Sequence, residues 1–300
     1  MASRPTYPVY VISKGRASSR LCLTARFLLR DRVPFLLVVE PQEYDDYVAA
    51  FPNATVQALP FANLGLGGIP ARNWCWEHSL AAGHERHWIL DDNLSCVKRW
   101  YKGKRIPCDA GTAFRVVEDF VDRYENVAIA GLNYEMFCVA QKGGAPPFYL
   151  NAHVYSCLLI LNSLTNRWRG RYNEDADLCL QVLSGGWCTV LINAFMVWKP
   201  QTMRMSGGNM ETLYQGDGRL KMARSLERVW PGVVSVRRRF QRPQHHVKNS
   251  WRKFDTQLRL KHGIDLASMA TNEYGLTLRA VTTVKSPALA KLLREHTGER

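Results

Sequence analysis

Short apolar runs alternate with segments of helical apolar spacing between residue 9 and residue 60. The apolar runs at residues 9–13, 33–39 and 54–60 have the length of buried strands. Residues 41–51 read as a helix that begins at a proline. An earlier helix is indicated by apolar side chains at helical spacing, namely Leu21, Ala25, Leu28 and Leu29. This βαβα order predicts a parallel sheet whose ligands lie at the carboxyl ends of its strands.

The run GLGGIPARNWCWEHSLAAGHERHWILDDN at residues 65–93 combines a glycine-rich turn, a helix and a strand. Pro70 in the first helical turn and Gly83 beyond the last predict a helix over residues 71–82. The apolar strand at residues 87–90 then delivers Asp91, Asp92 and Asn93 at its carboxyl end. Adjacent carboxylates repel unless hydrogen-bond donors or a cation offset them, and a divalent metal carrying a phosphate is a natural offset. Such a triplet is also ordinary turn chemistry.

Beyond Asn93 the pattern predicts a hairpin and then further alternation. Residues 94–101 and 104–107 are its two arms, with Lys102-Gly103 at the tip. From residue 212 onward the chain is predicted to be mainly helical. The remaining predicted elements are a helix over residues 112–124, strands over 126–132, 148–161 and 187–198, and a Gly/Pro-rich loop at 143–147.

A second acidic segment, NEDADLCLQ at residues 173–181, predicts a helix with acids in its first turn. Asn173 is a favourable N-cap residue, and Glu174 and Asp175 suit the positive end of the helix dipole. On this basis alone the acids can be purely structural. Further along, Gly207 and Gly208 permit close backbone approach to a phosphate.

Length and composition constrain the class of protein. The 300 residues, 46% of them hydrophobic, can bury a sizeable core, and we expect one domain over residues 1–210 and a basic helical extension over residues 211–300. No apolar stretch is long enough to cross a membrane and the N-terminus lacks a signal-peptide core, so a soluble intracellular protein is expected. The eight cysteines lack paired spacing and are predicted to be reduced, buried small hydrophobes.

Positive charge is concentrated along the chain. The formal net charge is +14, and residues 236–262 hold nine Lys or Arg against one acid, with Phe240, Trp251 and Phe254 interleaved. This mixture suits phosphate neutralisation and stacking on unpaired bases, although a solvated basic surface is equally compatible. The hairpin tip WYKGKR, residues 100–105, can wedge or stack a nucleotide unless Trp100 packs in the core. The expected nucleic-acid contacts are Trp100, Tyr101, Lys102, Lys104, Arg105, Arg237, Arg238, Arg239 and Arg242.

Three segments together resemble one enzyme family. They are ARNWCWEHS at residues 71–79, RHWILDDN at 86–93 and YNEDADLCLQVL at 172–183, preceded by a Ser-Lys-Gly-Arg loop at 13–16. This set resembles the TET-associated glycosyltransferases of bacteriophages, over approximately Tyr7 to Gly208. The resemblance implies an α/β fold of the GT-A type, with a Rossmann-like mixed sheet flanked by helices. It also implies transfer of a sugar from a nucleotide-sugar, expected to be a UDP-sugar, to the hydroxymethyl group of a modified pyrimidine such as 5-hydroxymethylcytosine in phage DNA.

The same resemblance implies roles for individual residues. Asp91, Asp92 and Asn93 would hold a divalent metal, Mn or Mg, although the neutral Asn93 departs from the usual Asp-x-Asp pattern and is a weaker ligand. Asp175, with Glu174 beside it, would accept the proton of the acceptor hydroxyl. The residues expected around the donor are Lys14, Arg16, Arg72, Asn73, Asp91, Gly207 and Gly208.

Three other functions stay open at this point: a nucleotidyltransferase, a glycosyltransferase acting on a glycan or protein, and a DNA-binding module without catalysis. Release of pyrophosphate would indicate the first, and salt-sensitive DNA binding without donor affinity the last. The expected partners are DNA containing a hydroxymethylated pyrimidine and a nucleotide-sugar. We expect a monomer in the cytoplasm of a phage-infected bacterial cell, without membrane association.

Overall fold

The computed structural model describes residues 4–18, 20–139, 146–200, 218–239, 242–251 and 253–266. The chain divides into two compact units, Met1–Arg259 and Leu260–Arg300, and the first holds every element discussed below. Gly207, Gly208 and the predicted boundary near residue 210 lie outside the described residues, as does most of the loop at 143–147.

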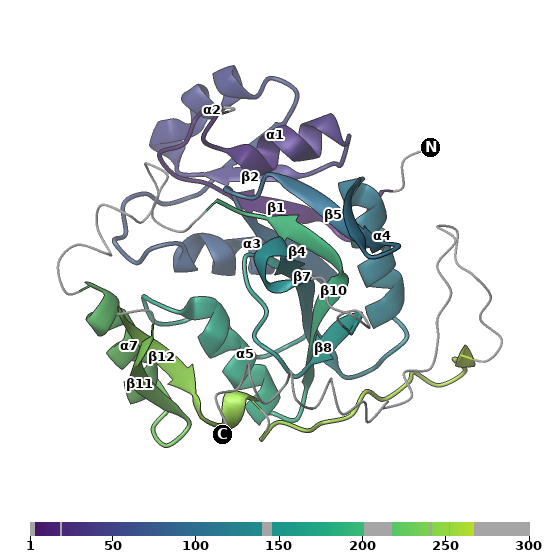
Figure 1. The fold of residues 1–300 in the computed structure, drawn as a ribbon. Coiled ribbons are helices and arrows are strands. Elements are labelled where there is room, and N and C mark those ends of the chain that lie inside the picture. Colours follow the sequence, from purple (N-terminus) through teal and green to yellow (C-terminus); the bar gives the residue numbers. More distant parts are fainter. Residues whose placement is uncertain are drawn as a thin grey trace. The chain divides into compact units, whose positions relative to one another are not determined.

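The N-terminal part alternates strands and helices as the apolar pattern predicts. Four of its strands lie side by side in the parallel order β3-β2-β1-β4 (Figure 1). The predicted helix after the glycine-rich turn is confirmed, with Pro70 in its first turn and Gly83 in the left-handed conformation (φ 77°) just beyond it. The elements are β1 Val9–Ile12, α1 Leu23–Arg30, β2 Leu36–Val39, η1 Pro41–Glu43, α2 Tyr44–Ala50, β3 Thr55–Ala58, α3 Ile69–Ala81 and β4 Arg86–Asp91.

Beyond β4 the sheet becomes mixed, as the fold prediction requires. Its order continues β4-β9-β7-β10-β5-β6, with β9 antiparallel to both neighbours and β7 parallel to β10. Because β9 runs in the opposite direction, its first residue lies at the same edge as the last residues of β4, β7 and β10. The elements are β5 Cys96–Tyr101, β6 Lys104–Cys108, α4 Ala110–Val121, β7 Val127–Tyr134, η2 Glu135–Phe137, β8 Phe148–Leu150, β9 Cys157–Leu161, α5 Glu174–Ser184 and β10 Cys188–Trp198.

The single strand predicted over residues 148–161 is wrong, because the structure has two strands there. β8 pairs with β10, whereas β9 lies between β4 and β7, so the chain must cross from one position to the other. Asn151 (φ 54°) and Ser156 (φ 59°) take left-handed backbone conformations at the two ends of this crossing. The crossing leaves Ser156 immediately before β9, at the edge where β4 ends.

Helices cover both faces of the sheet. Successive side chains of β4 alternate between the faces. Ile89 joins a core cluster with Trp76 of α3 and Leu178 of α5, whereas Trp88 stacks on Phe114 of α4 with ring centroids 4.5 Å apart. All eight cysteines are free, and six of them are buried as predicted, whereas Cys96 and Cys108 are half-buried. None of the helices that the structure describes is long and apolar enough to cross a membrane.

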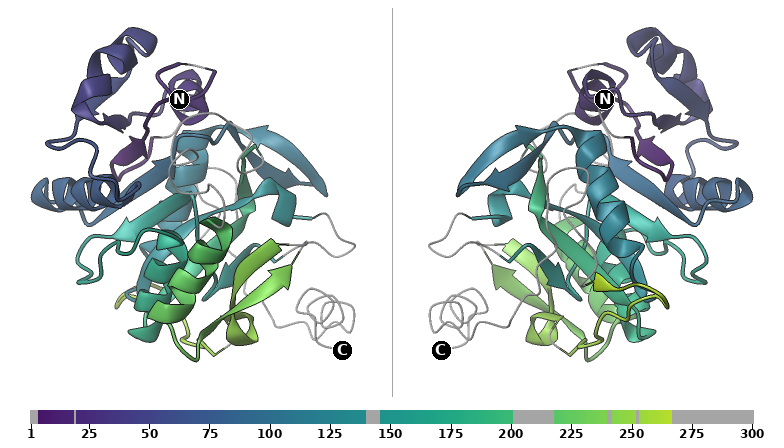
Figure 2. Two further views of the ribbon diagram at one scale, coloured as in Figure 1. Left: turned by 90° about the vertical axis from the view of Figure 1, so that its left-hand side faces the viewer. Right: turned by 90° about the vertical axis from the view of Figure 1, so that its right-hand side faces the viewer.

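The basic segment differs from the helical prediction. Helix α7 Gly218–Val229 is followed by an antiparallel pair, β11 Val234–Arg239 and β12 Arg242–Val247, and by the short η3 Lys248–Trp251. Leu226, Val234 and Val247 pack against Ala176 and Leu180 of α5, and Figures 1 and 2 show α7 beside that helix. The β-branched residues of this segment and Pro243 favour strands over a helix. Its dense positive charge follows no regular period and therefore gave no indication of the strands.

Candidate active site

Side chains from four neighbouring strands meet at one edge of the sheet. Asp91 is the last residue of β4, Tyr134 ends β7, Ser156 precedes β9, and Lys199 follows β10. The order β4-β9-β7-β10 makes these strand ends adjacent. This is the edge at which α/β proteins of this kind bind ligands.

Asp91 is the centre of this group. Its Oδ1 accepts a hydrogen bond from Nη2 of Arg72 at 2.7 Å, and its Oδ2 accepts from Oγ of Ser156 at 2.6 Å and from Nζ of Lys199 at 2.9 Å. Burial alone raises the pKa of Asp91, but the charges of Lys199 and Arg72 outweigh burial and hold the pKa well below its usual range. The Asp91 carboxylate is therefore ionised and held in one orientation.

Lys199 is a member of the site that the sequence interpretation did not assign. Besides Asp91, its Nζ donates to the hydroxyl of Tyr134 at 3.2 Å and to Oγ of Ser156 at 3.0 Å. Its side chain is 12% exposed. Burial lowers the pKa of Lys199, but the charge of Asp91 outweighs this and raises the pKa, so the ammonium stays charged. The sequence feature that could have indicated Lys199 is its position directly after a mostly apolar strand.

Arg72 links the strand edge to α3 and has unused donors. Its guanidinium lies 4.8 Å from the ring centroid of Trp168, and Nε is 3.8 Å from Oε1 of Glu174. Nε and Nη1 are buried and find no hydrogen-bond partner among the described residues. Two nitrogens of a buried cation, with three N–H groups between them, are thus available to an anionic ligand.

The side chain of Asn73 contacts Trp168 rather than the other residues expected around the nucleotide-sugar. Its side-chain amide accepts from the backbone N–H of Trp168 at 3.0 Å and donates to the Trp168 carbonyl at 2.9 Å. This clamp holds the Trp168 ring against Arg72. Asn73 therefore positions Arg72 through Trp168.

Glu174 and Asp175 occupy the first turn of α5, beside Arg72. Burial, followed by the charge of Asp175, raises the pKa of Glu174, and burial likewise raises the pKa of Asp175 although Arg72 opposes it. No side chain in the described part of the chain donates a hydrogen bond to the half-buried Asp175 carboxylate. A carboxylate with an elevated pKa that accepts no hydrogen bond from a described side chain is suited to proton acceptance.

The next acid in this helix has a different role. The buried Asp177 accepts hydrogen bonds from Arg169, Gln181 and Trp230 at 2.6–3.1 Å. Asn173 lies at the predicted N-cap position of α5, but its side chain makes no capping hydrogen bond: its backbone is left-handed (φ 55°) and its side chain donates to the carbonyl of Met222 instead. Asp177 and Asn173 thus connect α5 to the C-terminal part of the unit.

Asp92 belongs to the scaffold of the site. Its carboxylate pairs with the guanidinium of Arg16 and accepts from Oγ of Ser13 at 2.7 Å, and both acidic and basic side chains are less than 10% exposed. Thr24 of α1 binds the neighbouring backbone, with Oγ1 donating to the Asp91 carbonyl at 2.6 Å. Lys14, in the same loop as Arg16, pairs with Glu40 at 2.6 Å.

The predicted metal ligands, in this arrangement, do not fit a divalent ion. Both oxygens of Asp91 are bound to cations or hydroxyl groups, as are both oxygens of Asp92. Of these three side chains, Asn93 alone has a buried oxygen, Oδ1, that finds no hydrogen-bond partner among the described residues. In the described part of the chain there is no cluster of three His, Cys, Asp or Glu side chains that could hold a metal. Three cations, from Arg16, Arg72 and Lys199, already surround the two carboxylates.

The hairpin β5–β6 is joined to the site through Glu135. Lys102 (φ 47°) and Gly103 (φ 74°) form its tip, which confirms the hairpin prediction. The hairpin lies at the end of the sheet order (Figure 2). Lys98 and Arg105 pair with Glu135 at 2.8 and 3.4 Å, and Glu135 directly follows Tyr134.

Aromatic side chains are exposed both on the β5–β6 hairpin and on η2, which contains Glu135. Tyr101 at the hairpin tip is 48% exposed and Phe137 of η2 is 58% exposed. Trp100 is half-buried, with Arg105 over its ring at 5.4 Å and its indole nitrogen buried without a partner among the described residues. The Phe137 ring lies 6.0 Å from that of Tyr134, whose hydroxyl accepts a hydrogen bond from Lys199. The exposed aromatic side chain of η2 is thereby connected to Lys199.

The β11–β12 pair carries the second basic surface. Arg237, Arg238 and Arg242 are exposed, whereas the side chain of Arg239 lies outside the described atoms. Because this pair packs on α5, whose first turn holds Asp175, the basic strands and the candidate base share one support.

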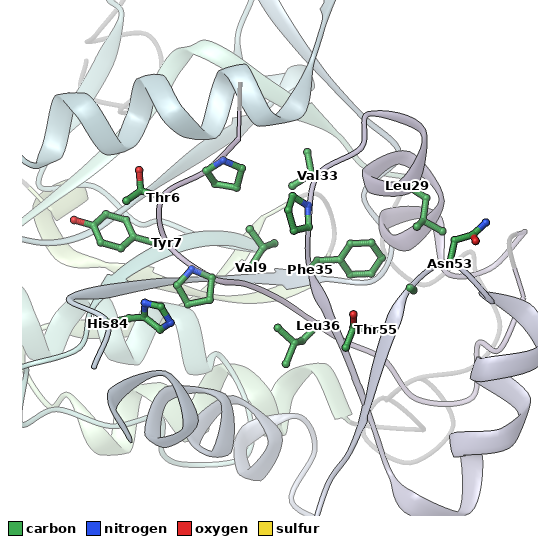
Figure 3. Close-up of a pocket in the computed structure, with 14 residues that line it drawn as sticks. Thr6, Tyr7, Val9, Leu29, Val33, Phe35, Leu36, Asn53, Thr55 and His84 are labelled. Atoms are coloured by element: carbon green, nitrogen blue, oxygen red, sulfur yellow. The ribbon is translucent and has the colours of Figure 1, made fainter. Parts of the chain in front are cut away.

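A pocket of about 520 Å³ lies elsewhere in the molecule. Its lining includes Thr6, Pro34, Thr55 and His84, near the starts of the parallel strands (Figure 3). Asp91 and Lys199 are at the opposite ends of the strands. This pocket is therefore separate from the candidate active site.

Comparison with known proteins identifies the family. Residues 7–208 match the family described as TET-Associated Glycosyltransferase, and the chain belongs to this family and is a glycosyltransferase. No curated protein matches the chain.

Matching solved structures include two transferases. One, from Desulfovibrio desulfuricans, is described as a putative nucleotide-diphospho-sugar transferase; it is 10% identical, with a TM-score of 0.34, over 64% of this chain and 80% of that one. The other, mannose-1-phosphate geranyltransferase from Thermus thermophilus, is 13% identical, with a TM-score of 0.30, over 68% of this chain and 59% of that one. At these TM-scores, the assignment rests on the family match.

Proposed function

We propose that this member of the TET-associated glycosyltransferase family transfers a sugar from a nucleotide-sugar to the hydroxymethyl group of a modified pyrimidine in DNA. The observation that carries the proposal is the Asp175 carboxylate, to which no described side chain donates a hydrogen bond, beside a cationic cluster at the strand edge. Transfer needs both parts, a base for the acceptor and positive charge for the leaving diphosphate.

The donor diphosphate is assigned to the cationic side of the cluster. Nε and Nη1 of Arg72 are buried donors without partners in the described structure, and a phosphate oxygen satisfies them. Trp168 and Glu174 hold the guanidinium from two sides. The UDP-sugar expected from the family resemblance fits this assignment by its diphosphate alone, because no described contact distinguishes the nucleoside.

The sugar is transferred at the anomeric carbon, either by a single displacement with inversion of configuration or by a mechanism that retains it. In the displacement, the acceptor oxygen forms the new bond, Asp175 takes its proton, and the sugar–phosphate bond breaks with its electron pair passing to the diphosphate. Arg72 then faces an anion with more charge than the donor had, so its contact strengthens as the bond breaks. Glu174 assists by orienting Arg72.

The DNA acceptor is supported by two basic surfaces joined to the site. Glu135 connects the aromatic and cationic hairpin to Tyr134, and α5 connects the arginine-rich β11–β12 pair to Asp175. Cations that neutralise phosphates and an aromatic residue that stacks on a displaced base are the two parts that DNA base modification requires. A glycan or protein acceptor would need neither.

The deciding experiment incubates the full chain with duplex DNA containing 5-hydroxymethylcytosine and a panel of nucleotide-sugars, followed by mass spectrometry of the digested nucleosides. We expect a hexose or N-acetylhexosamine mass increment on the hydroxymethylated nucleoside with at least one donor. The matched control is the same duplex with unmodified cytosine, which should gain no mass. Donor consumption without any increment on hydroxymethylated DNA would overturn the DNA acceptor, and release of pyrophosphate would overturn glycosyl transfer itself.

A further inference from the structure

We infer that Lys199 takes the place of a divalent cation in this enzyme, so that its donor diphosphate is bound and released without a metal ion. The inference rests on the proposed nucleotide-sugar donor. The two acids at the end of β4, Asp91 and Asp92, suggest a metal site in the sequence. In the structure, however, cationic side chains of the protein already contact both of them.

The charge balance at the strand end opposes a further cation. Asp91 and Asp92 contribute two negative charges, and Arg72, Arg16 and Lys199 contribute three positive charges within hydrogen-bond distance of them. A divalent ion on Asp91 would have to displace Lys199 or Arg72 and would then lie next to the displaced charge. Glu174 and Asp175 add negative charge beside Arg72, so the site holds no overall excess of positive charge. What an incoming diphosphate can contact is the Lys199 ammonium and the Arg72 nitrogens that find no hydrogen-bond partner among the described residues.

The geometry of Lys199 allows it to reach a ligand. Its Nζ has three acceptors for its three protons, and the longest contact is the one with the Tyr134 hydroxyl, at 3.2 Å. Tyr134 has a second partner in Oγ of Ser156 at 2.5 Å, so it does not lose all hydrogen bonding when Lys199 turns away. A diphosphate oxygen can therefore replace Tyr134 on Nζ while Asp91 and Ser156 continue to hold the ammonium.

The chemistry then balances without a metal. When the sugar–phosphate bond breaks, its electron pair passes to the diphosphate oxygen, and the ammonium of Lys199 and the guanidinium of Arg72 neutralise that charge. Both groups are buried, and the charge of Asp91 keeps Lys199 protonated by raising its pKa. No proton transfer to the leaving group is required.

The first test uses the wild-type chain and needs no variant. After treatment with EDTA, binding of UDP, GDP, ADP, CDP and dTDP is measured by calorimetry, with and without added Mn²⁺. We expect at least one nucleoside diphosphate to bind with a Kd that changes less than twofold on addition of Mn²⁺. Binding that requires Mn²⁺ would overturn the lysine assignment and leave the proposed function standing. Failure of every nucleoside diphosphate to bind, with or without Mn²⁺, would overturn both.

The second test changes the lysine. Lys199→Met should weaken nucleoside diphosphate binding at least tenfold, whereas Lys199→Arg should stay within about threefold of wild type because the charge is retained. Lys221→Met is the matched control, since Lys221 is exposed on α7, and its affinity should equal that of wild type. If Lys199→Met fails to fold, the double variant Asp91→Asn/Lys199→Met also removes the carboxylate charge that Lys199 balances and should lose affinity at least tenfold. Wild-type affinity in a folded Lys199→Met or double variant would overturn the inference.

Discussion

Replacement of Asp175 by asparagine separates catalysis from folding more sharply than any other change at this site. No described side chain donates to the Asp175 carboxylate, so this nearly isosteric substitution removes no hydrogen bond to a described side chain, and the amide oxygen can still accept from the backbone. We expect the free energy of unfolding to change by less than about 0.5 kcal/mol. A positioned general base contributes about 100-fold to 10,000-fold, and kcat should fall by about this factor while the Kd for the donor is retained.

Asp177→Asn is the matched control, two positions along the same helix. Its carboxylate is buried and accepts from Arg169, Gln181 and Trp230 at 2.6–3.1 Å. Asparagine keeps one acceptor oxygen but loses the charge that pairs with Arg169, at a cost of about 2–3 kcal/mol. For a chain of this size, that cost lowers Tm by roughly 3–5 °C. Turnover per folded molecule should remain at the wild-type level.

The assay measures sugar transfer to hydroxymethylated DNA well below the Tm of both variants, with donor affinity from calorimetry and Tm from circular dichroism. The two variants should separate: one loses kcat without loss of Tm, and the other loses Tm without loss of kcat. A folded Asp175→Asn enzyme with kcat within tenfold of wild type would refute proton acceptance by Asp175. Parallel losses of Tm and activity in both variants would make Asp175 a structural residue like Asp177.

Four further changes test other parts of the site. Burial raises the pKa of Asp175, so as pH falls the base should become protonated, and kcat/KM should be lost, above the usual aspartate range; the residual activity of Asp175→Asn should lack this acidic limb in a pH–rate profile. Asp92→Ala removes the carboxylate that pairs with the buried Arg16 guanidinium and should lower the free energy of unfolding by about 3–5 kcal/mol in urea titrations, and a loss under 1 kcal/mol, roughly, would contradict the scaffold role. Replacing Arg237, Arg238 and Arg239 together by alanine should flatten the slope of log affinity for DNA against log salt by roughly 2 to 3 without changing donor hydrolysis, and an unchanged slope would leave this strand a solvated surface. Trp100→Ala or Tyr101→Ala should reduce transfer to duplex more than to single-stranded DNA, and equal losses on both would argue against a wedge.

Local signals were sufficient for much of the fold. Helix α3 begins near Pro70 and ends near Gly83, as these two residues predict, because each acts through its own backbone conformation. The same holds for the tip of the β5–β6 hairpin, where Lys102 and Gly103 take the left-handed conformations that a two-residue turn requires. Asp91 at the end of β4 followed from these boundaries.

The parts that sequence could not supply depend on the order of strands in the sheet. Ser156, Tyr134 and Lys199 meet at Asp91 only because β9 is inserted in reverse between β4 and β7. Gly131 permits that insertion, since an added Cβ there would lie 2.2 Å from the carbonyl oxygen of Cys157. No local periodicity reports a pairing between strands so far apart in the chain, and the lysine could not be assigned without it.

The adjacent aspartates show how pairing partners divide a motif that looks uniform in sequence. Asp91 ends the strand and faces Arg72 and Lys199, whereas Asp92 begins the turn and faces Arg16 from the first loop. Two neighbouring carboxylates still require a compensating charge, as the sequence argument held. Here each has its own cation, supplied by a different segment of the chain. One carboxylate thereby holds Arg72 and Lys199, the two cations proposed to bind the donor, and the other joins the first loop to the turn after β4.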